Sequence, residues 1–313
     1  MGESDSLQKI GIVIPTLNEE KSIGNVIRDL KNELQKLDYE IVVVDGKSSD
    51  KTIAISKELD ANIIIQKNKG YGEALFAGYF YAANELNCQI LVTIDADGTY
   101  SSKDCVKIIN KIISFDADYV VGKRLVNSEN MTLSHRIGNK VISWLIRKFL
   151  KIKLQDTQSG LFGFRSYLID NIDLRQSGWA VNTEMLTKAS DLGMIIDEVD
   201  VAYYPRIGKT NINTLNAGLV NLQVILRMVR DSNPLLLLGV IGLFLFIAGI
   251  YAGSVVILDY ITTGVVHHSN LAILSTLFIM AGIQLVSLGM VADMIKKRQQ
   301  TRLKMAHNLY RKA

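Results

Sequence analysis

Cysteine is nearly absent from this sequence: the chain of 313 residues contains two, Cys88 and Cys105. Two cysteines offer neither a disulfide framework nor a zinc cluster, and they fit a reducing compartment. The four histidines likewise have no spacing that is typical of a metal site. Residues 1–10 are polar and lack the apolar core of a signal peptide, so we expect nothing to export the N-terminal part of the chain.

Charged side chains are missing from two long stretches near the C-terminus, residues 235–258 and 271–292. Both stretches lack Asp, Glu, Lys, Arg and His, and both exceed the length of about 20 residues that a helix needs to span a bilayer. They contribute to a mean hydropathy of +0.18 for the chain. We predict a hairpin of two transmembrane helices, in preference to a buried hairpin of a soluble core.

Lysine and arginine are also absent from the connector between the two stretches, residues 259–270. The basic residues that flank the stretches on the other side are Arg227, Arg230, Lys296, Lys297, Arg298, Arg302 and Lys304. Because basic residues favour the cytoplasmic side, we expect an integral membrane protein with both ends in the cytoplasm. The net charge of +4 is modest, and its concentration near the spans favours anionic lipid over nucleic acid as a partner.

The rest of the chain alternates short apolar runs with helical patterns. The runs predicted as strands are residues 10–15, 39–45, 62–65, 90–94 and 118–122, with an edge strand at 199–204. Such alternation indicates βαβ units and an α/β fold with a mostly parallel sheet. We expect Asn18 to cap the first helix.

Residues 134–154 are basic and amphipathic, which fits a membrane surface and a packed core about equally well.

Polar residues follow three of the predicted strands, at residues 15–19, 45–50 and 95–99. In parallel sheets ligands bind beyond the carboxyl ends of the strands, so we expect these segments to form one site. Asp95 and Asp97 lie two residues apart and point the same way on an extended segment, where they suit Mg²⁺ or Mn²⁺. An ordinary Asp-Gly turn is the alternative. The first strand is not followed by the Gly-rich sequence of an NAD-binding domain.

Six motifs occur in an order and spacing that resemble glycosyltransferase family 2, and within it the polyprenyl-phosphate hexose synthases typified by dolichol-phosphate mannose synthase and bacterial undecaprenyl-phosphate glucosyltransferases. The motifs are residues 13–20, 43–52, 95–97, 121–124, 156–160 and 182–185. The resemblance covers about residues 8–230. It implies a Rossmann-like GT-A catalytic domain at residues 1–214 in the cytoplasm, followed by an amphipathic interfacial helix at 215–233, two transmembrane helices at 234–294 and a basic tail at 295–313.

The resemblance also implies a set of site residues for a nucleotide-sugar donor and a divalent cation. The residues expected at the donor are Pro15, Leu17, Glu19, Val43, Asp45, Asp95, Ala96, Asp97, Arg206 and Lys209, with Asp95 and Asp97 as metal ligands. Arg124 and Arg136 are expected to bind the acceptor phosphate. Asp95, Asp97, Asp156 and Glu184 are the candidate catalytic residues, with a turn cap as the alternative for Asp156 and a helix-cap partner as the alternative for Glu184. Leu17 and Thr99 depart from the mannose synthases, which tend to have an aromatic residue and a glutamine there.

The resemblance further implies the inverting transfer of one hexose, mannose or glucose, from a GDP- or UDP-linked donor to dolichyl or polyprenyl phosphate. Because a phosphate monoester is already ionised near neutral pH, the reaction needs no strong general base. We also expect the spans to give lipid access and to support a homo-oligomer. The rival functions are a processive polysaccharide synthase, whose Gln-x-x-Arg-Trp motif is missing here, and a membrane-anchored binding protein without turnover.

Overall fold

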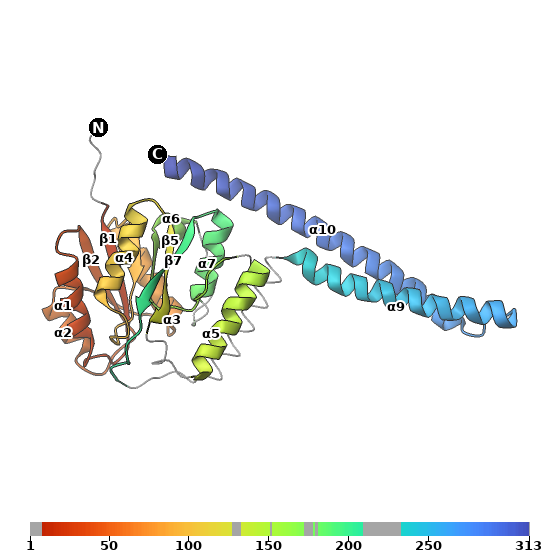
Figure 1. The fold of residues 1–313 in the computed structure, drawn as a ribbon, viewed down its shortest axis with the longest axis horizontal. Coiled ribbons are helices and arrows are strands. Elements are labelled where there is room, and N and C mark those ends of the chain that lie inside the picture. The colour runs from red at the N-terminus through yellow and green to blue at the C-terminus, as the bar shows by residue number, and fades with distance from the viewer. Residues whose placement is uncertain are drawn as a thin grey trace. The chain divides into compact units, whose positions relative to one another are not determined.

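The computed structural model describes residues 8–126, 133–150, 152–171, 178, 181–208 and 233–312. The chain divides into two compact units, Met1–Ile225 and Leu226–Ala313. Figure 1 traces both units along the chain. The predicted interfacial helix at residues 215–233 lies almost wholly outside the described residues.

A seven-stranded sheet in the order β3-β2-β1-β4-β6-β5-β7 forms the centre of the first unit. The strands are β1 (Ile10–Thr16), β2 (Tyr39–Asp45), β3 (Asn62–Ile65), β4 (Ile90–Thr93), β5 (Tyr119–Val126), β6 (Phe162–Arg165) and β7 (Ile196–Ala202). All neighbouring pairs are parallel except those made by β6, which runs antiparallel to β4 and β5. The predicted mostly parallel sheet is confirmed, and β6 is a strand that the sequence did not predict.

Helices cover both faces of this sheet (Figure 1). They are α1 (Ile23–Glu33), α2 (Thr52–Glu58), α3 (Tyr71–Phe80), α4 (Ser102–Ile113), α5 (Leu133–Leu145), α6 (Tyr167–Asp170) and α7 (Val181–Leu192), with π-helical turns η1 (Tyr81–Glu85) and η3 (Ile146–Leu150). Alternate residues of β1, such as Ile12, pack against apolar residues of α1 and α4. Val13 points to the opposite face and contacts α3 at Gly78, where a Cβ atom would lie 2.4 Å from it.

The start of the first helix differs from the prediction. The helix begins at Ile23, and Asn18 lies upstream of it with a left-handed φ of 57°. The Asn18 carboxamide oxygen accepts a hydrogen bond from the Ser49 backbone N–H (2.8 Å), and the Ser48 hydroxyl accepts one from the Asn18 N–H (2.8 Å). Asn18 therefore does not cap the helix, because its side chain joins the turn after β1 to the turn after β2.

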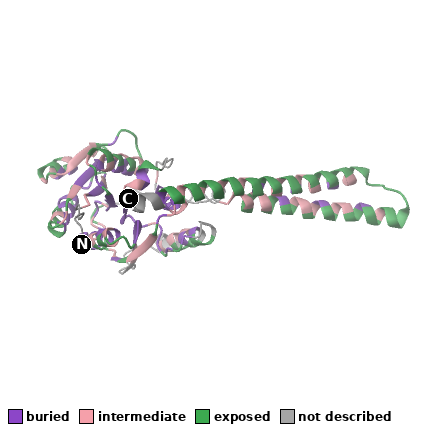
Figure 2. Cartoon of the chain, turned by 90° about the horizontal axis from the view of Figure 1, so that it is seen from above, coloured by how far each residue is buried: buried purple, intermediate pink, exposed green. Residues whose placement is uncertain are grey.

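The second unit is a hairpin of two antiparallel helices, α9 (Pro234–Thr263) and α10 (Ser269–Lys312). Both helices are long and apolar enough to cross a membrane, and only 11% of the apolar window of each is buried. Figure 2 shows exposed residues along most of both helices. A core helix of a soluble protein would be largely buried, so the low burial favours the predicted hairpin over a soluble core. The predicted basic tail continues α10 as helix to Lys312.

Candidate active site

The strand order brings the predicted site residues to one edge of the sheet. The carboxyl ends of β1, β2, β4, β5 and β7 share this edge because these strands are parallel. The antiparallel β6 brings its amino end to the same edge, together with the preceding residues 156–160. Segments that are far apart in sequence therefore meet beyond β4, where Asp95 and Asp97 lie.

Asp97 takes part in a turn and also in an ion pair. Its Oδ1 accepts hydrogen bonds from the Thr99 backbone N–H (3.0 Å) and the Thr99 hydroxyl (2.7 Å), while Gly98 adopts a φ of 76°. Its Oδ2 lies 3.2 Å from Nη1 of Arg206. The Asp-Gly turn thus exists, but it uses one oxygen of Asp97 and leaves Asp95 free for another function.

Asp95 is partly exposed and lies against the backbone of Gly160, where a Cβ atom would come within 2.1 Å of Oδ2. The Tyr71 hydroxyl donates a long hydrogen bond to Oδ1 (3.5 Å). Desolvation, followed by the charge of Asp97, raises the pKa of Asp95 to about 7. A hard cation bound by the carboxylate oxygens would favour the ionised form of Asp95 and so oppose this shift.

The donor set fits a weakly chelated Mg²⁺ or Mn²⁺. Among the described residues, no group of three or more His, Cys, Asp or Glu side chains is arranged to hold a metal ion. The two carboxylates of Asp95 and Asp97 would therefore share the ion with water and phosphate oxygens, which Mg²⁺ accepts readily. Thr99 donates its hydroxyl to Asp97, so in this conformation it orients the carboxylate that we expect to bind the ion.

Arg206 is held across the site by two acidic residues. Its guanidinium pairs with the carboxylate of Glu19 through Nη2 and with Asp97 through Nη1. The backbone beside it is fixed as well, because the Ile207 N–H donates to the Asp97 carbonyl (3.0 Å) and the Tyr204 N–H donates to the Thr99 carbonyl (2.9 Å). Burial raises the pKa of Glu19, although the charge of Arg206 opposes this shift. Arg206 thus places positive charge where a cation and a diphosphate are expected.

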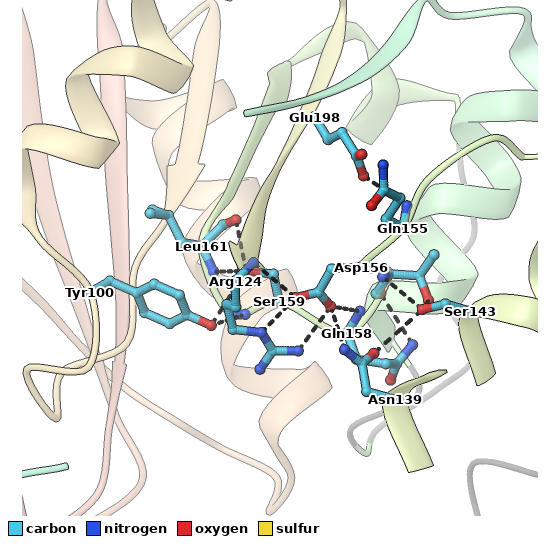
Figure 3. A network of polar contacts seen from close by, with 12 residues as sticks. Tyr100, Arg124, Asn139, Ser143, Gln155, Asp156, Gln158, Ser159, Leu161 and Glu198 are labelled. Carbon is cyan, nitrogen blue, oxygen red and sulfur yellow. Dashed lines mark hydrogen bonds and ion pairs between the residues drawn. The ribbon is translucent and has the colours of Figure 1, made fainter. Parts of the chain in front are cut away.

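A second network, shown in Figure 3, is centred on Arg124 and Asp156. Nε and Nη2 of Arg124 donate to the two carboxylate oxygens of Asp156 at 2.7 and 2.9 Å, and both side chains are less than 10% exposed. The Asn139 amide of α5 donates to the same carboxylate (2.9 Å). Burial alone would raise the pKa of Asp156, but the charge of Arg124 and these hydrogen bonds hold it below its usual value. Asp156 is therefore an ionised partner that fixes the guanidinium of Arg124.

Two tyrosines connect this network to the aspartates. The Tyr100 hydroxyl accepts a hydrogen bond from the Gly160 N–H (2.8 Å), and Gly160 is the residue that packs against Asp95. The Tyr203 ring meets the Tyr100 ring edge to face at 5.6 Å, and the Arg124 guanidinium lies 5.6 Å from the Tyr203 ring centre. We did not identify these tyrosines from the sequence, although Tyr100 directly follows the strand-end motif at residues 95–99.

The other residues expected at the donor divide into surface and buried positions. Leu17 is 44% exposed and Pro15 is partly exposed. Val43 has no exposed surface, and its side chain belongs to the hydrophobic core. Asp45 is also fully buried and accepts hydrogen bonds from the backbone N–H (2.8 Å) and hydroxyl (2.5 Å) of Ser48. The structure thus places Val43 and Asp45 beneath the edge of the sheet; Ala96, between the two aspartates, is 3% exposed.

The remaining predicted residues lie around the Arg124 network. Arg136 is partly exposed on α5, one helical turn before Asn139. Glu184 is buried in the first turn of α7, next to Thr183, whose hydroxyl accepts a hydrogen bond from the Gln158 amide (2.8 Å). Lys209 is not among the described residues. The roles predicted for these side chains stay predictions.

Known proteins similar to this chain include archaeal glycosyltransferases. Glycosyltransferase AglJ of Haloferax volcanii is 26% identical over 95% of this chain and 97% of the relative. The UDP-N-acetylglucosamine–dolichyl-phosphate N-acetylglucosaminyltransferase of Methanococcus voltae is 33% identical over 61% of this chain and 84% of the relative. A dolichyl-phosphate hexose transferase of H. volcanii is 30% identical over 67% and 89%, respectively.

The solved structures of glucosyl-3-phosphoglycerate synthase from Mycobacterium tuberculosis share the fold. The complex with Mn²⁺, UDP-glucose and phosphoglyceric acid superposes with a TM-score of 0.57 at 20% identity, covering 71% of this chain and 80% of that chain. The family model named glycosyl transferase family 2 matches residues 11–173, which are just over half of the chain. These residues contain β1 from its second residue, β2 to β6, both aspartates and the Arg124–Asp156 pair, and on this match the chain belongs to glycosyl transferase family 2.

Proposed function

We propose that the protein transfers a single hexose from a nucleotide sugar to dolichyl or polyprenyl phosphate with inversion at the anomeric carbon. The observation that carries the proposal is the meeting of two charged centres at one edge of the sheet. Asp95 and Asp97 supply negative charge for a cation and a donor diphosphate, and Arg124 supplies a fixed guanidinium nearby. The apolar hairpin supports an acceptor that resides in a membrane.

On the donor side, Asp95 and Asp97 would hold Mg²⁺ or Mn²⁺, which when bound stabilises the negative charge of the departing nucleoside diphosphate. Arg206 would exchange its ion pair with Asp97 for one with the diphosphate, while Glu19 keeps hold of the guanidinium. Pro15 and Leu17 lie at the exposed rim of the same edge, where they would contact the base. The sugar carbon then faces the Arg124 side of the site.

On the acceptor side, Arg124 and Arg136 would bind the lipid phosphate. Asp156 uses Nε and Nη2 of Arg124, and Nη1 has no hydrogen-bond partner in the described part of the chain, so it is available for a phosphate oxygen. A phosphate monoester is its own anionic nucleophile, so no residue has to remove a proton. Asp156 would therefore act as a positioning residue for Arg124. A single displacement inverts the sugar carbon.

Several observations support attachment to the cytoplasmic membrane with the catalytic unit on the cytoplasmic side. Lys and Arg flank the hairpin at its open end and are absent from its connector. Helix α5 exposes Val141 and Trp144 at 50% and 48%, and the Lys148 ammonium lies 4.9 Å from the Trp144 ring centre. Exposed apolar side chains beside lysines suit the headgroup region of an anionic bilayer. Two relatives are named for dolichyl phosphate, which supports a lipid phosphate as the acceptor.

The proposal can be tested with membranes that contain the full-length protein and a panel of radiolabelled GDP- and UDP-sugars, including UDP-N-acetylglucosamine. Lipid extraction and identification of the labelled product would establish the sugar and the acceptor. Asp97→Asn keeps the shape of the side chain but removes its charge, so we expect transfer to fall by about 100-fold or more. The matched control is Asp116→Asn, because Asp116 is exposed and precedes β5 at the opposite edge of the sheet.

The expected result is a labelled lipid from the parent and from Asp116→Asn, and almost none from Asp97→Asn. Equal amounts of labelled lipid from all three proteins would contradict the assignment of Asp97. Labelled polysaccharide in place of a monosaccharide lipid would instead support the processive synthase. No labelled product from the parent with any donor would favour the binding protein.

A further inference from the structure

Helix α10 has two stripes of residues on opposite sides, and the first stripe is filled by α9. Ser275, Gly282 and Gly289 recur every seven residues and are buried or nearly buried in the hairpin. The Ser275 hydroxyl donates to the Gly249 carbonyl (2.8 Å), and a Cβ atom on Gly282 would lie 2.6 Å from the Gly242 carbonyl oxygen. Small residues thus let the two backbones approach closely, as in other membrane helix pairs.

The second stripe, called the outer stripe here, lies on the side of α10 that faces away from α9. Its members follow each other at alternating steps of four and three residues, and all of them are exposed. They are Ile273, Leu277, Met280, Gln284, Ser287, Val291 and Met294. Steps of four and three keep these side chains on one face of the helix, so the outer stripe is a continuous exposed face.

Two adjacent members of the outer stripe are polar, although they lie within the uncharged run of residues 271–292. The hydroxyls of Ser254, Ser275 and Thr276 donate to backbone carbonyls of the hairpin at 2.7, 2.8 and 3.0 Å. By contrast, the Gln284 amide and the Ser287 hydroxyl have no hydrogen-bond partner within the described helices α9 and α10. A bilayer core contains no water to satisfy these groups, so within it they would need a partner from beyond these two helices.

We propose that the outer stripe is the interface of a homodimer, in which Gln284 of one copy hydrogen-bonds to Gln284 of a second copy. This rests on the proposed membrane insertion of the hairpin. A carboxamide carries both a donor and an acceptor, so the same residue satisfies itself across a two-fold axis. Two copies inserted in one membrane have the same orientation, so their α10 helices run parallel and a two-fold axis along the membrane normal can bring the two Gln284 side chains together.

The surface around Gln284 has room for side chains of the second helix. Ile283, Gln284, Ser287, Leu288 and Val291 line a shallow, open hollow on the exposed face of α10. Side chains of a facing helix would pack into this face. Ser287 follows Gln284 by one turn on the same stripe, so it lies close enough to the axis to join the hydrogen bonds. A second copy would therefore fill the hollow and satisfy both polar groups.

Cysteine cross-linking of the full-length protein in lipid vesicles tests the interface directly. Gln284→Cys should form an intermolecular disulfide rapidly with copper phenanthroline, because the two-fold axis brings the two sulfur atoms together. Met290→Cys is the matched control: Met290 is 51% exposed in the same helix but lies outside the outer stripe. The native Cys88 and Cys105 are buried in the sheet unit, and burial raises the pKa of each thiol to about 12, so they should add little background.

The strength of the dimer is measured by fluorescence energy transfer between labelled copies as the protein is diluted in lipid. Gln284→Leu should weaken dimerisation roughly tenfold, whereas Gln284→Asn, which keeps a carboxamide, should lose less and Met290→Leu should change nothing. Unchanged dimerisation of Gln284→Leu, or equal cross-linking of the two cysteine variants, would overturn the proposal. A monomeric parent protein would also overturn it.

Cross-linking and energy transfer do not depend on sugar transfer, so they test the dimer separately from the proposed function. Extraction of the membranes with alkaline carbonate tests insertion itself. A monomer that resists extraction and transfers sugar would overturn the dimer alone. A protein that carbonate releases would overturn both the dimer and the membrane anchor.

Discussion

At the scale of single residues, the two aspartates after β4 have different surroundings. Asp97 is fixed by Thr99 and by Arg206, whereas Asp95 lies on Gly160 with one long hydrogen bond from Tyr71. The turn and the expected metal site are therefore compatible, because the turn orients Asp97 and Asp95 lies outside the turn. Desolvation, followed by the charge of Asp97, raises the pKa of Asp95, and a bound divalent cation would oppose both effects by favouring the ionised carboxylate.

We expect the affinity for Mn²⁺ to depend on pH near neutrality. The pKa of Asp95 is raised to about 7, and a protonated carboxyl is a poor ligand, so protons compete with the metal below that pH. The affinity should be nearly constant above about pH 7.5 and fall by up to about tenfold per pH unit well below pH 7. Titration of free Mn²⁺ by electron paramagnetic resonance between pH 5.5 and 8.5 measures this.

The control for the Mn²⁺ titration is Asp95→Asn, because the asparagine carboxamide does not titrate in this pH range. This variant should bind Mn²⁺ weakly and with a flatter pH profile than the parent. A parent protein whose affinity stays constant from pH 8.5 to pH 5.5 would show that Asp95 does not titrate in this range.

At the scale of secondary-structure elements, β6 is what joins the two halves of the site. This strand inserts between β4 and β5 and runs against both, which brings residues 156–160 next to Asp95. Gly160 then packs on Asp95, and Asp156 pairs with Arg124 at the end of β5. A parallel strand in the same position would carry this segment to the opposite edge of the sheet.

The hairpin offers a test at the same scale, because its two helices approach at glycine. A Cβ atom on Gly282 would lie 2.6 Å from the Gly242 carbonyl oxygen and 2.8 Å from the Phe246 nitrogen. Gly282→Val should therefore push the helices apart at a cost of about 1–3 kcal/mol. Gly239→Val is the matched control, since the nearest atom to its Cβ atom is 3.7 Å away, in Leu235.

An engineered disulfide reports on this packing. The paired changes Gly253→Cys and Ser275→Cys place two Cβ atoms 3.8 Å apart, which suits a disulfide bond between α9 and α10. We expect the bond to form readily in this background and with Gly239→Val, and to form more slowly and less completely with Gly282→Val. Equal rates in the two valine variants would mean that the helices do not approach at Gly282.

At the scale of the whole molecule, the sheet unit and the hairpin have separate tasks. The sheet unit has its own hydrophobic core and contains every predicted site residue that the structure describes. The hairpin contributes no residue to that site in our proposal, so its effect on transfer should come from holding the enzyme where the lipid is concentrated.

Removal of residues 234–313 tests this division of tasks. The shortened protein should keep transferring sugar to a short, water-dispersed polyprenyl phosphate at nearly the parent rate. Transfer to a long-chain acceptor in dilute vesicles should fall by about 100-fold, because the high local concentration of lipid is lost. The two acceptors assayed side by side give the control. An undiminished rate on the long-chain acceptor would show that the hairpin has no part in lipid access.

Local patterns in the sequence determined much of this protein. Apolar runs that alternate with helical patterns predicted the strands and the mostly parallel sheet, because strands buried between helices are apolar along their length. The two charge-free runs predicted the apolar helices α9 and α10, because a helix that can span a bilayer has no charged residues in its centre. The motif at residues 95–97 and the strand ends at residues 15–19 and 45–50 predicted which edge of the sheet carries the site.

Only the tertiary structure decided which of these residues meet. Arg206 pairs with Glu19, which is 187 residues away in the sequence. The Asn18 side chain binds the turn after β2 and does not cap the first helix as predicted. Arg124 and Asp156 pair because β6 runs antiparallel between β4 and β5. Such pairings depend on strand order, strand direction and side-chain orientation. The hydrophobic periodicity of a short segment carries no information about these contacts between distant segments.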